Sequence, residues 1–302
     1  MSQAHMPNMP TTGQFKDAVE QAQDTGHEAR EKATDVATSR WACYLARFGY
    51  AAKGVVYVLM GGIAARFALG AGGEPTDNKG AIRALSAEPF GKFLLAIIAV
   101  GLLGYALWNV VRAVLDIDHE GRKPRAILKR VGFAAVAFGY FGLSLAAAQL
   151  ASGRGSGGKS SDATTQDWTA RFLDLRIGVP LVVLGGVLFC AIALAVAYEG
   201  YSGRFMKYFS YGKLGQATER ALRWLGGFGL LSLAVVFVEI GVFLVVAALR
   251  HDPGKAKGLG GALLALAGDP FGPLLLGVVA VGLVAYGVYS FGQARYRRIG
   301  PA

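Results

Sequence analysis

A single carboxylate, Glu239, interrupts one of the long apolar runs of this chain, within the segment AVVFVEIGVFLVV. At the centre of a bilayer a carboxylate costs a few kcal/mol, so we expect its side chain to face the protein interior and to find a partner. Two interpretations stay open. Glu239 relays a proton or cation, or anchors a ligand; or it is structural, hydrogen-bonded to a Tyr, Ser or Asn of a neighbouring helix.

Lys53, within GYAAKGVVY, is the basic residue that could pair with Glu239. Alignment of the internal repeats described below places Lys53 about six residues, or roughly 9 Å, nearer one membrane surface. The flexible side chain either covers part of that gap or extends its ammonium to the surface. With Tyr57 and Tyr140, which share one repeated position, these residues form the candidate intramembrane polar site: Glu239, Lys53, Tyr57 and Tyr140.

The elements that must position these residues come from a repeated unit. Residues 80–113, GAIRALSAEPFGKFLLAIIAVGLLGYALWNVVRA, align without a gap with GALLALAGDPFGPLLLGVVAVGLVAYGVYSFGQA, which starts at Gly261. The segments GYAAKGVVY, GFAAVAFGY and GLLSLAVVF, which start at residues 49, 132 and 229, also align. Self-similarity of this kind determines architecture more strongly than any local motif. We therefore predict a polar arm over 1–40 and three units over 41–118, 124–206 and 220–296.

The composition indicates that these units lie in a lipid bilayer. Hydrophobic residues make up 53% of the chain and charged residues 17%, whereas a soluble domain carries about 25% charged residues. A membrane-spanning helix needs roughly 20 mostly apolar residues, and the sequence offers six such stretches: 45–69, 93–115, 131–150, 177–198, 225–249 and 273–292. The prediction is an all-α integral membrane protein.

Each unit contains two predicted spans, so every copy enters the bilayer in the same direction. Parallel repeats are related by an axis along the membrane normal, and three of them predict a pseudo-threefold body of six helices. A row of duplicated hairpins is the alternative. Small residues spaced four apart, Ala135/Gly139 and Gly186/Cys190, predict close helix packing.

The basic residues predict an orientation. Most of the 31 lysine and arginine residues lie in the N-terminal region, after the second and fourth spans, and at the C-terminus. Basic residues near span ends favour the cytoplasm, so both termini are expected on the cytoplasmic side of the plasma (inner) membrane. The net charge of +11 also favours anionic lipid on that face. Nucleic-acid binding is not predicted, because the charges are dispersed over several loops.

Two related motifs precede the second spans of units one and three, Glu88-Pro89-Phe90-Gly91 and Asp269-Pro270-Phe271-Gly272. An acid followed by Pro is typical of a helix start, because the carboxylate caps free backbone N–H groups and Pro fits the first turn. The alternative is a gate or re-entrant piece that lines a vestibule. Unit two lacks the motif and carries a Gly/Ser-rich segment, 152–161, which we expect to be a flexible linker.

No catalytic arrangement is present in the sequence. The four histidines do not pair with other ligands at metal-binding spacing, and the motifs of nucleophile elbows, phosphate loops and dinucleotide sites are absent. We predict no enzymatic activity, no metal and no cofactor.

The segments GYAAKGVVYVLMG and EPFGKFLLAIIAVGLLGYALW resemble the bacterial domain of unknown function 1206 family, over residues 41–298. The resemblance implies three tandem two-helix membrane repeats, and it transfers no substrate or site residue. The predicted function is a structural or lipid-interacting membrane body. The alternative is a transporter or channel for a small solute, ion or proton that uses Glu239.

Overall fold

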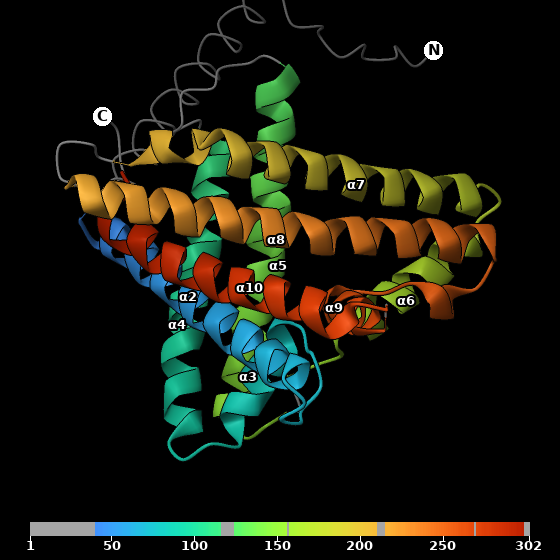
Figure 1. Ribbon diagram of the computed structural model, residues 1–302, viewed down its shortest axis with the longest axis horizontal. Helices are drawn as coiled ribbons and strands as arrows, with labels where there is room; N and C mark the ends of the chain where they lie inside the picture. The colour runs from blue at the N-terminus through green and yellow to red at the C-terminus, as the bar shows by residue number, and fades with distance from the viewer. Residues whose placement is uncertain (1–39, 116–123, 156, 210–214, 269, 299–302) are drawn as a thin grey trace, which may run out of the picture.

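Six long helices dominate the structure, a computed structural model that describes residues 40–115, 124–155, 157–209, 215–268 and 270–298 (Figure 1). All six are long and apolar enough to cross a bilayer, which confirms the six predicted spans. The predicted arm lies almost wholly outside the described residues. The helices are α2 (Arg40–Ala68), α4 (Gly91–Val114), α5 (Pro124–Ala151), α7 (Gly178–Ser202), α8 (Gln216–Leu249) and α10 (Gly272–Tyr296).

A short helix precedes the second long helix of every unit. These are α3 (Asn78–Ser86), α6 (Ser161–Leu173) and α9 (Leu259–Ala267). Two short 3-10 turns complete the described helices, η1 (Arg204–Tyr208) and η3 (Pro253–Lys255). The flexible linker that we expected over 152–161 forms only the first part of the connection between α5 and α7. The helix α6 begins at Ser161, and the Ser160 side chain caps it.

A glycine begins each of these second helices because the preceding short helix leaves no room for a Cβ atom. An added Cβ would lie 2.0 Å from the Leu85 carbonyl oxygen at Gly91, 2.2 Å from that of Phe172 at Gly178, and 2.1 Å from that of Ala267 at Gly272. The predicted capping role of Glu88 is wrong. Phe90 occupies the N-cap of α4, with a left-handed φ of 60° and no side-chain bond, and the Gly91 N–H closes the turn by donating to the Glu88 carbonyl at 2.8 Å. Asp269 lies outside the described residues.

The long helices pack in a cyclic order. The second helix of each unit lies against the first helix of the next, in the pairs α4–α5, α7–α8 and α10–α2. In Figure 1, α4 and α5 run from top to bottom, α7 and α8 run across the molecule, and α2 and α10 lie side by side between these directions.

The three interfaces use the same repeat positions. An added Cβ at Gly61 would lie 2.7 Å from the Ala280 carbonyl oxygen, and one at Gly241 would lie 2.8 Å from that of Gly186. At the third interface, the Ser144 hydroxyl donates to the Ala99 carbonyl at 2.7 Å. Lipid is as apolar as the helix surface, so membrane helices associate through close approach and interhelical hydrogen bonds of this kind. The arrangement is pseudo-threefold rather than a row of hairpins.

In this cyclic arrangement, which we call the ring, one pair of long helices does not pack together within the described part of the chain. Within units one and three the two long helices pack together, α2 on α4 and α8 on α10, but among the described residues α5 and α7 have no comparable contact. A Cβ at Gly49 would lie 2.5 Å from the Tyr105 nitrogen and one at Gly229 would lie 2.7 Å from Tyr286, whereas no atom lies within 4 Å of the same position at Gly132. We call this opening the α5–α7 seam. The predicted packing of Gly186 is confirmed, and that of Gly139 is wrong because Gly139 faces open space.

Candidate functional site

A cavity of about 300 Å³ lies inside the ring, at the end of the bundle where α2, α5 and α8 begin. We call it the central cavity. All six long helices contribute to its lining, and two sets of lining residues occupy equivalent positions in the three repeats. These sets are Tyr50, Phe133 and Leu230 near the start of the first helices, and Arg112, Glu199 and Gln293 near the end of the second helices. The cavity therefore surrounds the pseudo-threefold axis.

The lining of the central cavity is strongly basic. Lys53, Arg112 and Arg297 are only 3%, 7% and 7% exposed, and Lys129 adds a fourth, half-buried cation beside the single lining carboxylate of Glu199. A buried charge carries a desolvation cost of several kcal/mol unless hydrogen bonds or an opposite charge offset it. Three buried cations around one cavity are the arrangement that an anion would stabilise.

The Lys53 ammonium is enclosed by tyrosines. Its Nζ donates to the Tyr286 hydroxyl at 2.8 Å, and it lies 4.5 Å from the Tyr286 ring centre, 5.2 Å from that of Tyr105 and 5.8 Å from that of Tyr50. Aromatic faces attract a cation, by roughly 0.5–2 kcal/mol per contact. Lys53 uses one of its three N–H donors in the bond to Tyr286, and no carboxylate of the described residues forms an ion pair with it.

The two arginines stack on aromatic rings. The Arg112 guanidinium lies 3.7 Å from the Phe133 ring centre, and that of Arg297 lies 4.7 Å from Tyr208 and 5.2 Å from Tyr50. The backbone of Arg297 pairs with Phe209 in an isolated β-bridge, which joins the end of α10 to the segment after α7. Stacking on aromatic faces and bidentate hydrogen bonds to a carboxylate or phosphate are both typical of arginine.

Two buried polar atoms of the lining have no hydrogen-bond partner within the described part of the chain, the Tyr50 hydroxyl and the Gln293 Oε1. Tyr50 is 1% exposed. A buried hydroxyl without a partner costs about 1–3 kcal/mol. Because Tyr50 lines the cavity, its hydroxyl is a donor available to an occupant.

Four tyrosines separate the central cavity from the other half of the bundle. Tyr57 and Tyr286 meet edge to face with ring centres 4.8 Å apart, and Tyr105 and Tyr140 do so at 4.7 Å. We call these four residues the tyrosine layer. The predicted site residues Lys53, Tyr57 and Tyr140 therefore lie in one aromatic cluster, although only Lys53 lines the central cavity.

Beyond the tyrosine layer lies a second cavity of about 420 Å³, the outer cavity. One wall is the face of α5 from Val136 to Leu143, and the other consists of the first residues of α3, α6 and α9. Val136 lines both cavities. The hydroxyls of Thr164 and Thr165 donate to carbonyls of their own helix at 2.8 Å.

The first turns of the short helices are joined by hydrogen bonds. Asp77 accepts from the Gly80 and Ser161 N–H groups at 2.7 and 2.5 Å. Asp162 accepts from the Gly258 and Gly261 N–H groups at 2.6 and 3.0 Å. Asp77 and Asp162 therefore link α3 to α6 and α6 to α9, and they neutralise the positive ends of these helices.

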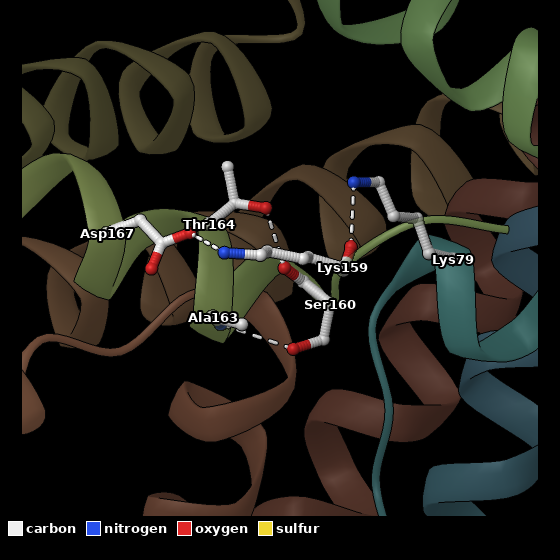
Figure 2. A network of polar contacts seen from close by, with 6 residues as sticks. All are labelled: Lys79, Lys159, Ser160, Ala163, Thr164 and Asp167. Atoms are coloured by element: carbon white, nitrogen blue, oxygen red, sulfur yellow. Dashed lines mark hydrogen bonds and ion pairs between the residues drawn. The ribbon is translucent and has the colours of Figure 1, made fainter. Parts of the chain in front are cut away.

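Figure 2 shows how the loop before α6 is attached to its neighbours. Lys79 donates to the Lys159 carbonyl at 2.8 Å, and Lys159 forms an ion pair with Asp167. The Ser160 hydroxyl accepts from the Ala163 N–H at 3.2 Å and so caps α6. The described part of this Gly/Ser-rich loop is thus held by α3 and α6.

Glu239 does not belong to either cavity. It is half-buried on α8 and lines neither the central nor the outer cavity, while Lys53 donates to Tyr286 instead. Its proposed role in a relay stays a prediction. Glu88, Pro89 and Phe90 are exposed and line neither cavity. No group of three His, Cys, Asp or Glu side chains in the described ranges could hold a metal ion.

Sequence reasoning missed Tyr50, Arg112 and Arg297. A signal existed for one of them, because Arg112, Glu199 and Gln293 are polar residues at one shared repeat position near the ends of the second spans. Arg297 follows the last span, and its burial depends on the bridge to Phe209, which no local pattern indicates.

Comparisons with known proteins agree with the repeats. The sequence profile of the Domain of Unknown Function (DUF1206) family matches residues 48–116, 131–203 and 228–297. Uncharacterized protein YxxB of Bacillus subtilis (strain 168) is 34% identical over 262 residues, which cover 87% of this chain and 94% of that protein. No solved structure matches the chain. The chain belongs to the Domain of Unknown Function (DUF1206) family, with three tandem copies of its repeat in one multi-pass membrane protein.

Proposed function

We propose that the protein binds the anionic headgroup of a membrane lipid in its central cavity. The observation that carries the proposal is the burial of Lys53, Arg112 and Arg297 around one cavity on the pseudo-threefold axis. An anionic group offsets the desolvation of the three cations, and bidentate hydrogen bonds from arginine favour phosphate or carboxylate. The volume lies at the lower limit of typical ligand pockets, about 300–1,000 Å³, which suits a headgroup better than a large metabolite.

We also propose that the central cavity faces the cytoplasm. The loops and termini at this end carry most of the lysine and arginine residues, which favours the cytoplasmic side. Anionic lipid attracts basic residues near that surface by about 1 kcal/mol each. The cavity would then take its ligand from the inner leaflet of the plasma membrane.

Native mass spectrometry tests the proposal. The purified protein is mixed with equal amounts of phosphatidylglycerol and phosphatidylcholine, and the fraction carrying each lipid is measured. We expect preferential retention of phosphatidylglycerol, and a loss of about tenfold in Arg112→Gln, equivalent to about 1.4 kcal/mol. The control is Arg66→Gln, which removes an exposed arginine at the far end of α2. Equal retention of the two lipids by the wild-type protein would contradict the proposal.

Transport of a small anion is the second candidate function. It is favoured by one observation, the outer cavity on the opposite side of the tyrosine layer. Phosphate flux into protein-containing liposomes distinguishes the two. Flux that Arg112→Gln abolishes would favour transport, whereas lipid retention without flux would favour binding alone. The same flux measurement on Glu239→Gln shows whether that carboxylate contributes to any flux.

A further inference from the structure

We infer, on the basis of the proposed headgroup binding, that an acyl chain of the bound lipid leaves the central cavity through the α5–α7 seam and follows α5 into the outer cavity. The two cavities then form one bipartite site, basic at one end and apolar along α5. The ligand class is an anionic lipid with a long acyl chain, rather than a soluble anion.

The first observation is the empty space along α5. No atom lies within 4 Å of a Cβ position at Gly132, Gly139 or Gly142, and the same is true of Gly185 on α7. At the equivalent sites of units one and three, Gly49 and Gly229 touch the partner helix. The seam is therefore open where the other two repeats are closed, and the surrounding solvent at this depth is lipid.

The second observation is that the two cavities share a lining residue. Val136 lines both cavities and is 37% exposed, whereas the equivalent Lys53 and Leu233 are 3% and 6% exposed. The same residue position is closed in two repeats and open in the third. Val136 is thus the point where a ligand held in the central cavity would pass toward the outer cavity.

The third observation is that the path along α5 matches an acyl chain in its chemistry and its length. The α5 wall of the outer cavity consists of Val136, Phe138, Gly139, Tyr140, Gly142 and Leu143, and the Thr164 and Thr165 hydroxyls opposite are bonded within α6. From Phe133 to Leu143 the axis of α5 rises by roughly 15 Å. This is about half of the ~30 Å hydrocarbon core, the depth that an acyl chain of one leaflet occupies.

Photocrosslinking tests the inference. The probe is a phosphatidylglycerol with a diazirine in the middle of one acyl chain, and labelled residues are mapped by mass spectrometry. We expect labels to concentrate on α5 between Val136 and Leu143. Gly139→Trp, at a position that lines only the outer cavity and faces open space, should reduce this labelling at least fivefold while the fraction of protein that carries phosphatidylglycerol is retained. The matched control is Phe141→Trp, on an exposed position of the same helix that lines neither cavity.

The outcomes separate the inference from the function on which it rests. Even labelling of all lipid-exposed helices, or the same map from a phosphatidylcholine probe, would overturn the inference while preferential lipid retention persists. A wild-type protein that retains no phosphatidylglycerol would overturn the proposed function as well. If Gly139→Trp does not fold, Gly142→Leu narrows the same passage, and the wild-type map is decisive without either variant.

Discussion

At the scale of single residues, the notable group is the ammonium of Lys53. Its repeat-equivalent residues are Val136 and Leu233, so the fold accepts an apolar side chain at this position in the other two units. Lys53 is buried among tyrosines, and its one hydrogen-bond partner in the described part of the chain is a neutral hydroxyl. We therefore propose that the positive charge serves ligand binding rather than folding.

We expect Lys53→Met to leave the unfolding temperature unchanged or to raise it, because it removes a desolvated charge and keeps the side-chain volume. The same variant should lower phosphatidylglycerol retention by about tenfold, which corresponds to about 1.4 kcal/mol. Thermal unfolding in detergent and native mass spectrometry measure the two effects. A clear fall in unfolding temperature with unchanged retention would show that Lys53 is structural.

At the scale of helices and their contacts, equivalent glycines have unequal roles. Gly49 touches the backbone of Tyr105, and Gly132 faces open space. Gly49→Ala should therefore destabilise the protein by about 1–3 kcal/mol through overpacking. Gly132→Ala should be neutral or stabilising by up to about 1 kcal/mol, since alanine is the better helix former. Comparable losses of unfolding temperature in both variants would contradict an open seam.

The hydrogen bonds between the short helices give a second prediction at this scale. Asp77→Ala removes the N-cap of α3 and the acceptor for the Ser161 N–H. We expect a loss of about 1–2 kcal/mol, as for other N-caps, whereas Glu74→Ala, at an exposed position of the same loop, should change little. Chemical or thermal unfolding of the two variants in detergent provides the comparison, and equal stabilities would show that the link between α3 and α6 is not stabilising.

The helices and repeats were predictable because they depend on local hydrophobicity and on self-similarity, as the six spans and the repeated Gly91 and Gly272 positions show. The helix α6 was missed because unit two carries a polar SDATTQDWTARFL segment with no apolar match in the other units. The central cavity was not predictable from local pattern, because the burial of Arg112 and Arg297 depends on contacts between distant helices and loops.

At the scale of the whole molecule, the orientation follows from the basic residues and from the even number of spans. We expect a fluorescent protein that matures only in the cytoplasm to fluoresce when fused after Ala302. A fusion between α2 and α3, near Gly72, should remain dark because that loop lies on the opposite side of six alternating spans. Whole-cell fluorescence at matched expression measures both, and the reverse pattern would place the central cavity on the outer side.

The whole molecule is best described as three equivalent interfaces in a ring that is open at one place. This geometry follows from the repeats: two units close on themselves through Gly49 and Gly229, and the unit that has diverged most in sequence does not. In the proposed function, the open ring would give lipid lateral access to the basic cavity, which a closed pseudo-threefold bundle would not allow.

Cysteine crosslinking tests this geometry most directly, in a chain whose Cys43 and Cys190 are replaced by alanine. A disulfide needs two Cβ atoms about 3.8 Å apart. The pair Ala99→Cys and Ser144→Cys, at the closed α4–α5 interface, should form a disulfide on mild oxidation. The pair Gly132→Cys and Ile192→Cys, across the α5–α7 seam, should remain reduced. Efficient oxidation of the second pair in membranes would show that the ring is closed and would contradict this account.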